Sequence, residues 1–232
     1  MPNARCGPSS RWGPAWFELR HGLPIALGVL VRRFGILGAL GVLARVARRR
    51  QRADPVAGAP PGRLGAAQER ASLSQLRGLF CLDDVLSEEM DLPLAERLEV
   101  LGAIVAQAGA RFIALGAAIP IRGWLGASAD GRERQARRAL DHFPNARCEL
   151  RHVAPDALHF DVVYCRLAEV CRAMRREHLA ALYCRADAVY FDGREGRPAL
   201  ERAETIAAGD ARCSFRLRLG SPGSERKPTD SP

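Results

Sequence analysis

Apolar side chains recur at helical spacing through the first two thirds of the chain. The longest such stripe runs from residue 94 to about residue 119, where apolar residues step by four and three in turn. Pro93 suits the first turn of a helix, and Pro120 marks its end. Weaker patterns of the same kind predict helices over residues 23–46, 66–80 and 130–143.

The period changes to two in the last third, where apolar and polar residues alternate. This alternation predicts strands over residues 147–153, 158–165, 200–206 and 213–219. Gly209 and Asp210 lie between the last two runs and predict a hairpin. The final strand carries Cys213 on its apolar face and three arginines on the other face. Between the strands, one helix is predicted from residue 167 to 178.

These patterns predict an α+β fold, in which a helical N-terminal half packs on a small antiparallel sheet with one or two helices. Proline and glycine interrupt any regular structure over residues 51–66, which predicts a linker. We therefore expect an apolar, basic N-terminal extension with its linker over residues 1–65, one domain over residues 66–219, and a disordered tail over residues 220–232.

The net charge of +9 belongs to the extension alone. Residues 1–52 contain ten arginines and one acid, Glu18, whereas the remaining 180 residues balance 25 basic against 25 acidic side chains. No signature of a nucleic-acid-binding fold accompanies the arginines, so we expect no nucleic acid partner. The predicted domain itself is neutral, which is compatible with a small-molecule substrate.

The apolar stretch within residues 20–52 allows three interpretations. A helix docked on the core is favoured first, and contact with a membrane surface second. A secretory signal or a spanning helix ranks last, because Arg32 and Arg33 in its middle would each cost about 2.5–3.5 kcal/mol at the bilayer centre. The expected location is cytoplasmic or peripheral at a membrane, and no oligomeric state is indicated.

The seven cysteines fit no disulfide framework, since their number is odd and the chain is long. The sequence has no Cys-x-x-Cys pair, which excludes the usual zinc-ribbon and thioredoxin motifs. We expect reduced thiols. Four of the cysteines lie between residues 158 and 219.

Within that region the chain resembles the L-2-amino-thiazoline-4-carboxylic acid hydrolases. The shared pattern is an extended run that ends in cysteine, a helix, Cys-x-x-Asp, a variable loop, and Gly-x-x-x-Cys-x-Phe on the last strand. In this sequence it comprises Phe160 to Cys165, Cys184, Asp187, Glu201, Arg202, Thr205, Gly209, Cys213 and Phe215. The resemblance covers roughly the last third of the chain.

The resemblance implies hydrolysis of a cyclic amidine. Water adds to the ring carbon between sulfur and nitrogen, and the carbon–sulfur bond opens to leave an N-carbamoyl amino acid. In this hypothesis Cys184 attacks the ring if a neighbour activates its thiol, and Asp187 holds or deprotonates water. Cys165 and Cys213 complete the catalytic set, and no cofactor is required.

Two further residues are candidates for contact with the substrate. Arg202 would bind the carboxylate of the ring, although Arg216 is an equal candidate on sequence grounds. His178 lies on the predicted helix and is the second candidate, but a structural histidine is the more common outcome.

Other interpretations compete with catalysis. Cysteine is often a small buried filler, and core packing is about as frequent an outcome for Cys213 as a catalytic role. Cys165, Cys184, Asp187 and Cys213 are also a possible ligand set for zinc, which would make the domain a binding module without turnover. A relative without activity that acts as a scaffold is a third alternative.

Overall fold

The computed structural model describes residues 14–116, 121–141, 143–194 and 197–219, and its helical half precedes its sheet. The helical half contains α1 (Pro14–Phe17), the π-helical turn η2 (Glu18–Gly22), α2 (Leu23–Arg52), α3 (Ala66–Asp84), the π-helical turn η3 (Val85–Glu89) and α4 (Leu94–Gly116). Each of these helices corresponds to a predicted apolar pattern or continues one. Residues 117–120, where the longest predicted helix ends, and the predicted tail from residue 220 lie outside the described residues.

The C-terminal half contains the antiparallel sheet. In order it comprises α5 (Ile121–Leu125), α6 (Ala129–Asp141), β1 (Ala146–Val153), β2 (Ala157–Cys165), α7 (Arg166–Ala173), α8 (Glu177–Tyr190), β3 (Ala199–Glu201), the 3-10 turn η4 (Ile206–Ala208) and β4 (Cys213–Arg218). The strand order is β1-β2-β4-β3. This arrangement confirms the predicted α+β class.

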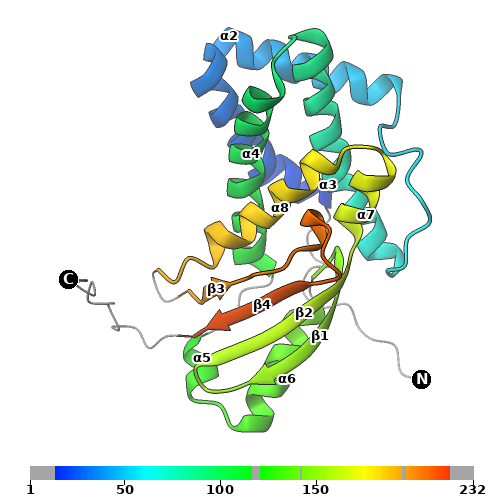
Figure 1. Ribbon diagram of the computed structural model, residues 1–232. Helices are drawn as coiled ribbons and strands as arrows, with labels where there is room; N and C mark the ends of the chain where they lie inside the picture. Colours follow the sequence, from blue (N-terminus) through cyan, green and yellow to red (C-terminus); the bar gives the residue numbers. More distant parts are fainter. Residues whose placement is uncertain (1–13, 117–120, 142, 195–196, 220–232) are drawn as a thin grey trace, which may run out of the picture.

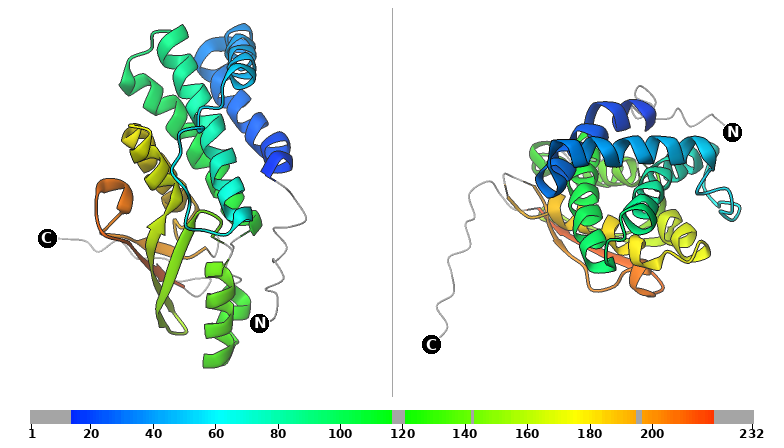
Figure 2. Two further views of the ribbon diagram at one scale, coloured as in Figure 1. Left: turned by 90° about the vertical axis from the view of Figure 1, so that its right-hand side faces the viewer. Right: turned by 90° about the horizontal axis from the view of Figure 1, so that it is seen from above.

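One face of the sheet is apolar and covered, and the other is polar. The register pairs Leu158 with Leu217 and Phe160 with Phe215, so these side chains share the covered face. Helices α5 and α6 lie behind this face in Figure 1, and the side view in Figure 2 shows α6 on that side of the strands. Alternation along each strand therefore leaves the opposite face to charged residues.

Two apolar clusters meet beneath α8. The first lies among α2, α3, α4, α7 and α8, and the second lies between the sheet and the helices α5 and α6, with the ends of α4 and α8. Cys165 and Ile206 pack against both clusters. The junction of the two clusters is thus where α7 follows β2 and where the loop after β3 passes α8.

The helix of the N-terminal extension belongs to the first cluster. Val29, Leu30, Ala39 and Val42 of α2 are buried against α3 and α4, which agrees with the favoured interpretation of a core-docked helix. Gly35 adopts φ 70° and ψ 174°, so α2 bends there into two helical segments. By length and composition, two helical stretches, residues 18–52 and 94–115, are apolar enough to cross a membrane.

The structure corrects two details of the predicted C-terminal half. The predicted helix over residues 167–178 is α7 followed by the start of α8, with Arg175 at a positive φ of 54° between them, and the continuation of α8 to Tyr190 was not predicted. The predicted strand over residues 200–206 is only Ala199–Glu201. Beyond it, Glu201 pairs with Arg216 while Glu204 exchanges hydrogen bonds with Ser214, so two residues oppose Phe215, as in a β-bulge.

Candidate functional site

The predicted catalytic residues come from three elements that meet at the junction of the two clusters. Cys184 and Asp187 lie three positions apart on α8, which places them on one side of the helix. Cys165 is the last residue of β2 and precedes the first turn of α7, and Cys213 begins β4. Fold topology therefore brings together residues that are up to 48 positions apart in the sequence.

Arg202 reaches this junction from the bulge after β3. Its Nη1 donates to Oδ2 of Asp187 at 2.8 Å, and its Nη2 donates to the carbonyl oxygen of Cys184 at 2.9 Å. The guanidinium also lies over the Phe215 ring, 5.0 Å from its centroid. Glu201 pairs with Arg216 on the polar face, so alternation points Arg202 toward the covered face, and Ala203 takes up the extra position of the bulge.

The Asp187 carboxylate is poised near neutral pH. Burial raises its pKa from 3.8, and the charge and hydrogen bond of Arg202 oppose that shift without cancelling it, so the pKa stands at about 6. A carboxyl group with a pKa near the working pH is suited to general acid–base chemistry. Among the predicted site residues, Asp187 has this property.

Each thiol of the junction affects the pKa of its neighbours. Cys165 and Cys213 each raise the pKa of Cys184, after the larger effect of burial, and the charge of Asp187 acts in the same direction. The resulting pKa of Cys184 is about 12, although nearby Arg202 lowers it. The three predicted cysteines and Asp187 are therefore neighbours, but the Cys184 thiol is protonated at neutral pH.

Cys165 and Cys213 have local hydrogen-bond partners as well. The backbone N–H groups of Ala168 and Leu167, at the start of α7, lower the pKa of Cys165, but burial dominates and raises it to about 11. The Sγ atom of Cys213 accepts a hydrogen bond from the backbone N–H of Ile206 at 3.2 Å. Burial raises its pKa too.

Cys148 joins this group, although its sequence context gave no reason to choose it. Its side chain shares the covered face of the sheet, and its pKa of about 12 is raised first by burial and then by Cys165, Cys213 and Asp187. The signal that was available is its position in the predicted strand over residues 147–153. Cys171, by contrast, is fully buried in the helical cluster, in agreement with a packing role.

An open hollow adjoins the junction at the bulge. It is lined by Glu201, Arg202, Ala203, Glu204, Ser214 and Arg216. The lining includes Arg202 and Arg216, the two candidates for contact with the substrate carboxylate. The hollow thus opens beside Arg202, whose guanidinium binds Asp187, and the predicted cysteines are not among its described lining residues.

The structure does not bring His178 to the junction. His178 begins α8 and lies beside Asp83, with Nε2 3.4 Å from Oδ2. Nine residues separate it from Asp187, which is about 13 Å along a helix. Arg97 and Arg176 pair with the same aspartate, so His178 belongs to an ion-pair cluster between α3, α4 and α8.

The zinc alternative requires ligands at metal-binding distance. Within the described residues, no group of three or more His, Cys, Asp or Glu side chains is placed to hold a metal ion. Cys165, Cys184, Asp187 and Cys213 are neighbours, but they do not form such a group.

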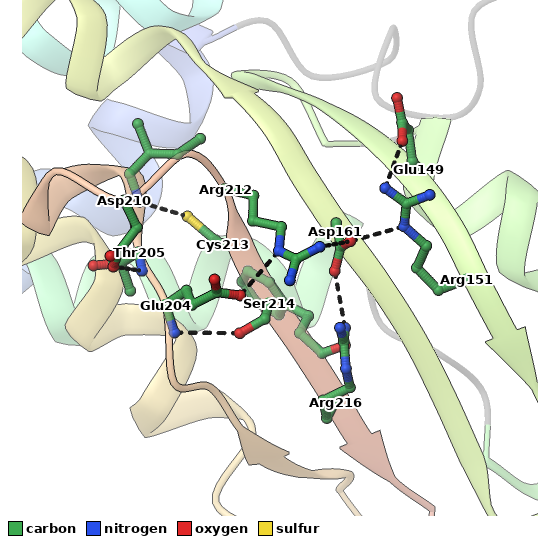
Figure 3. Close-up of polar contacts among 12 residues, drawn as sticks. Glu149, Arg151, Asp161, Glu204, Thr205, Asp210, Arg212, Cys213, Ser214 and Arg216 are labelled. Atoms are coloured by element: carbon green, nitrogen blue, oxygen red, sulfur yellow. Dashed lines mark hydrogen bonds and ion pairs between the residues drawn. The ribbon is translucent and has the colours of Figure 1, made fainter.

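A second buried carboxylate lies on the polar face of the sheet, as Figure 3 shows. Asp161 is 1% exposed and is bound by Arg151 at 2.7 Å, Arg216 at 3.0 Å and Arg212 at 3.3 Å. Burial raises its pKa, but hydrogen bonds from Arg151 and Arg216 and the charges of Arg216 and Arg212 outweigh burial and lower it. Sequence reasoning missed this cluster, although the three arginines of the final strand were visible.

Comparison with known proteins supports the motif. The family model described as L-2-amino-thiazoline-4-carboxylic acid hydrolase matches residues 127–217, which confirms the predicted resemblance for the C-terminal part of the chain. The matched range includes the sheet, α7 and α8, and therefore the whole junction, whereas α1 to α5 lie outside it. The match indicates a hydrolase-like function. Searches of curated proteins and of solved structures gave no match.

Proposed function

We propose that the protein hydrolyses a small cyclic amidine of the 2-amino-thiazoline-4-carboxylate type, and that the reaction takes place at the junction beneath α8. The observation that carries this proposal is the pKa of the Asp187 carboxylate, which is about 6 and so near neutral pH. Asp187 lies within the residues that the family model matches. Such a group is basic enough to accept a proton from water and acidic enough to return it.

In the proposed reaction, Asp187 accepts a proton from a water molecule as the water oxygen bonds to the amidine carbon. The bond between that carbon and the ring sulfur then breaks, and the proton passes from Asp187 to the departing sulfur. The second proton of the water ends on the ring nitrogen. The water oxygen becomes the carbonyl of an N-carbamoyl amino acid with a free thiol, so no oxidant, reductant or cofactor is needed.

Arg202 has two roles in this proposal. Its bond to Asp187 orients the carboxylate and keeps its pKa from rising further. Its position in the lining of the hollow places a cation where an anionic ring would approach. Arg216 also lines the hollow, together with the two acids Glu201 and Glu204. The substrate carboxylate would therefore meet Arg202 and Arg216 at the mouth of the site.

A direct attack by Cys184 receives less support. Burial raises its pKa to about 12, so its thiolate is scarce at neutral pH, and Arg202 faces Asp187 and the Cys184 carbonyl oxygen. We propose that Cys165, Cys184 and Cys213 instead line the site as neutral, polarisable groups. The six described cysteines are all free thiols, which fits a reducing compartment such as the cytoplasm.

The test is turnover of 2-amino-thiazoline-4-carboxylate, followed by mass spectrometry of the N-carbamoyl-cysteine product. The Asp187→Asn variant should lose at least about a hundredfold in kcat, as expected for removal of a general base. The wild-type kcat should rise with pH through the pKa of about 6, because Asp187 must be ionised to accept the proton. Cys184→Ser separates the two routes, since it should retain turnover in the water route and abolish it if Cys184 is the nucleophile.

His178→Gln provides a matched control on the same helix, because His178 lies outside the junction and should leave kcat unchanged. Full turnover by folded Asp187→Asn protein would contradict the role of Asp187. A folded wild-type protein that leaves this ring intact, together with a panel of related cyclic amidines, would contradict the proposed reaction.

A further inference from the structure

The second segment of α2 has two faces of different character. Residues after the bend at Gly35 bury Ala39 and Val42 in the helical cluster, and Leu43 and Val46 pack against it. The opposite face looks away from the protein. In the view from above in Figure 2, this segment crosses the top of the molecule with nothing drawn over it.

The outward face is apolar at its start. Leu37 is 85% exposed and Leu40 is 52% exposed, and Ile36 lies beside them. Gly41 and Ala44 continue the same face at helical spacing. Large apolar side chains that gather on one exposed surface mark an interaction site, whereas single ones do not.

The same face becomes basic toward the end of the helix. Arg48 and Arg52 follow Ala44 at four-residue steps and are exposed. Neither forms an ion pair with any residue that the structure describes. Cations in the last turn of a helix are stabilised by its dipole, but that effect does not account for the exposed leucines ahead of them.

The charges of α2 are divided between its two sides. The sequence from residue 19 to 53 contains no aspartate or glutamate. Arginines on the inward side of α2 meet acids of other elements: Arg33 pairs with Glu96, Arg45 with Glu89, and Arg49 with Asp84 and Glu88. The neutralised arginines therefore face the protein, and the uncompensated ones face solvent.

We propose that the outward face of α2, from Ile36 to Arg52, binds in the plane of an anionic lipid surface. Its leucines would enter the boundary between headgroups and acyl chains, and Arg48 and Arg52 would contact the lipid phosphates. This binding is independent of the proposed hydrolysis, because the junction beneath α8 lies in another part of the fold.

Two other occupants fit the surface less well. A spanning helix would have to remove Val29, Leu30, Ala39 and Val42 from the protein core. A second copy of the chain related by a two-fold axis would bring the same patch against itself, and that patch contains no acid to pair with Arg48 and Arg52. An anionic lipid surface complements both the apolar and the basic part of the face.

The test is sedimentation of the full-length protein with phosphatidylcholine vesicles, with and without phosphatidylglycerol. Binding should require phosphatidylglycerol and should fall at high salt, because screening weakens the arginine contacts. Arg48→Gln and Arg52→Gln should each reduce the partition constant about fivefold at low salt. At high salt, these variants and the wild type should bind alike.

Leu40→Gln tests the apolar part and should reduce the partition constant about tenfold. Leu115→Gln is its matched control, because Leu115 on α4 is also 52% exposed but lies outside this face, and it should bind as the wild type does. Absence of wild-type binding to the phosphatidylglycerol vesicles would overturn the proposal. An equal loss in the control would overturn it too, and so would a dimer in solution that Leu40→Gln dissociates.

Discussion

The polar face of the sheet and the junction beneath α8 each contain a carboxylate that is largely shielded from solvent, and the pKa values of the two are shifted in opposite directions. Asp161 is surrounded by three arginines, and its pKa is lowered. Asp187 has Arg202 as its cation, and its pKa is raised to about 6. Burial pushes both values upward; three arginines outweigh it at Asp161, and one arginine does not at Asp187.

This difference separates a structural charge from a chemically useful one. A carboxylate that three cations hold ionised cannot exchange protons near neutral pH, whereas one with a single partner can. Arg166, the first residue of α7, follows the pattern of Asp161. It is 1% exposed and binds Glu69 at 2.7 Å, Glu169 at 2.6 Å and the carbonyl oxygen of Pro60 at 2.6 Å, and these contacts join the linker to α3 and α7.

If charges with several partners are structural, then Arg166→Met should cost the most stability. We expect a loss of about 3–5 kcal/mol in the free energy of unfolding, because the substitution leaves the Glu69 and Glu169 carboxylates without their buried cation. Chemical denaturation at neutral pH measures it. Arg137→Met is the control, since Arg137 forms an exposed pair with Glu133 one turn away and should cost about 0.5 kcal/mol or less. Similar losses in the two variants would contradict the structural role of Arg166.

Asp161→Asn should cost somewhat less, about 2–3 kcal/mol, because the three arginines that it frees are partly exposed and can turn to water. The loss should depend on pH in a defined direction. A lowered pKa in the folded state stabilises the protein above the unfolded pKa of 3.8, and that contribution disappears as pH falls. Unfolding curves of wild type and variant should therefore converge in acid, and a gap that is constant with pH would argue against ionic binding.

Asp187→Asn should cost less, about 2 kcal/mol in the free energy of unfolding. This loss should shrink as pH rises, whereas the loss in Asp161→Asn should shrink as pH falls. Because the pKa of Asp187 is raised from 3.8 to about 6, the folded state binds the proton more tightly than the unfolded state does. The wild type should lose stability relative to the variant as pH rises from about 4 through about 6. Parallel curves for the two proteins over this interval would show that the pKa of Asp187 is not raised.

Local periodicity was enough to predict which residues share a strand face or a helix side. The alternation over residues 158–165 correctly placed Leu158 and Phe160 in the core. The Cys-x-x-Asp spacing puts Cys184 and Asp187 on one side of a helix, but the helix that carries them was not predicted over these residues. The alternation predicted polar character for Asp161 but not its burial, because the arginines that enclose it arrive from β1 and from the chain around β4.

Features that depend on long-range register were out of reach of the sequence. The contact between Arg202 and Asp187 depends on how β3 pairs with β4, which puts Arg202 on the covered face of the sheet. The position of Cys148 beside the other thiols depends on the pairing of β1 with β2. The bend of α2 at Gly35 needs a positive φ, which glycine permits, but a glycine in the sequence does not by itself predict one.

The smallest expected effect is the change in Tm on addition of zinc, and it follows from the raised pKa of Asp187. Asp187 has a raised pKa and protonated thiols around it, so a metal would have to displace several protons from Cys165, Cys184 and Cys213 in order to bind. We expect excess zinc to change the Tm by less than about 1 °C, because a ligand that does not bind the folded state cannot stabilise it. Asp161→Asn protein, with its sheet face altered but its junction intact, should respond identically. A clear rise in Tm that Cys184→Ser removes would instead favour the metal-binding interpretation, and stoichiometric zinc that survives dialysis of untagged protein would establish it.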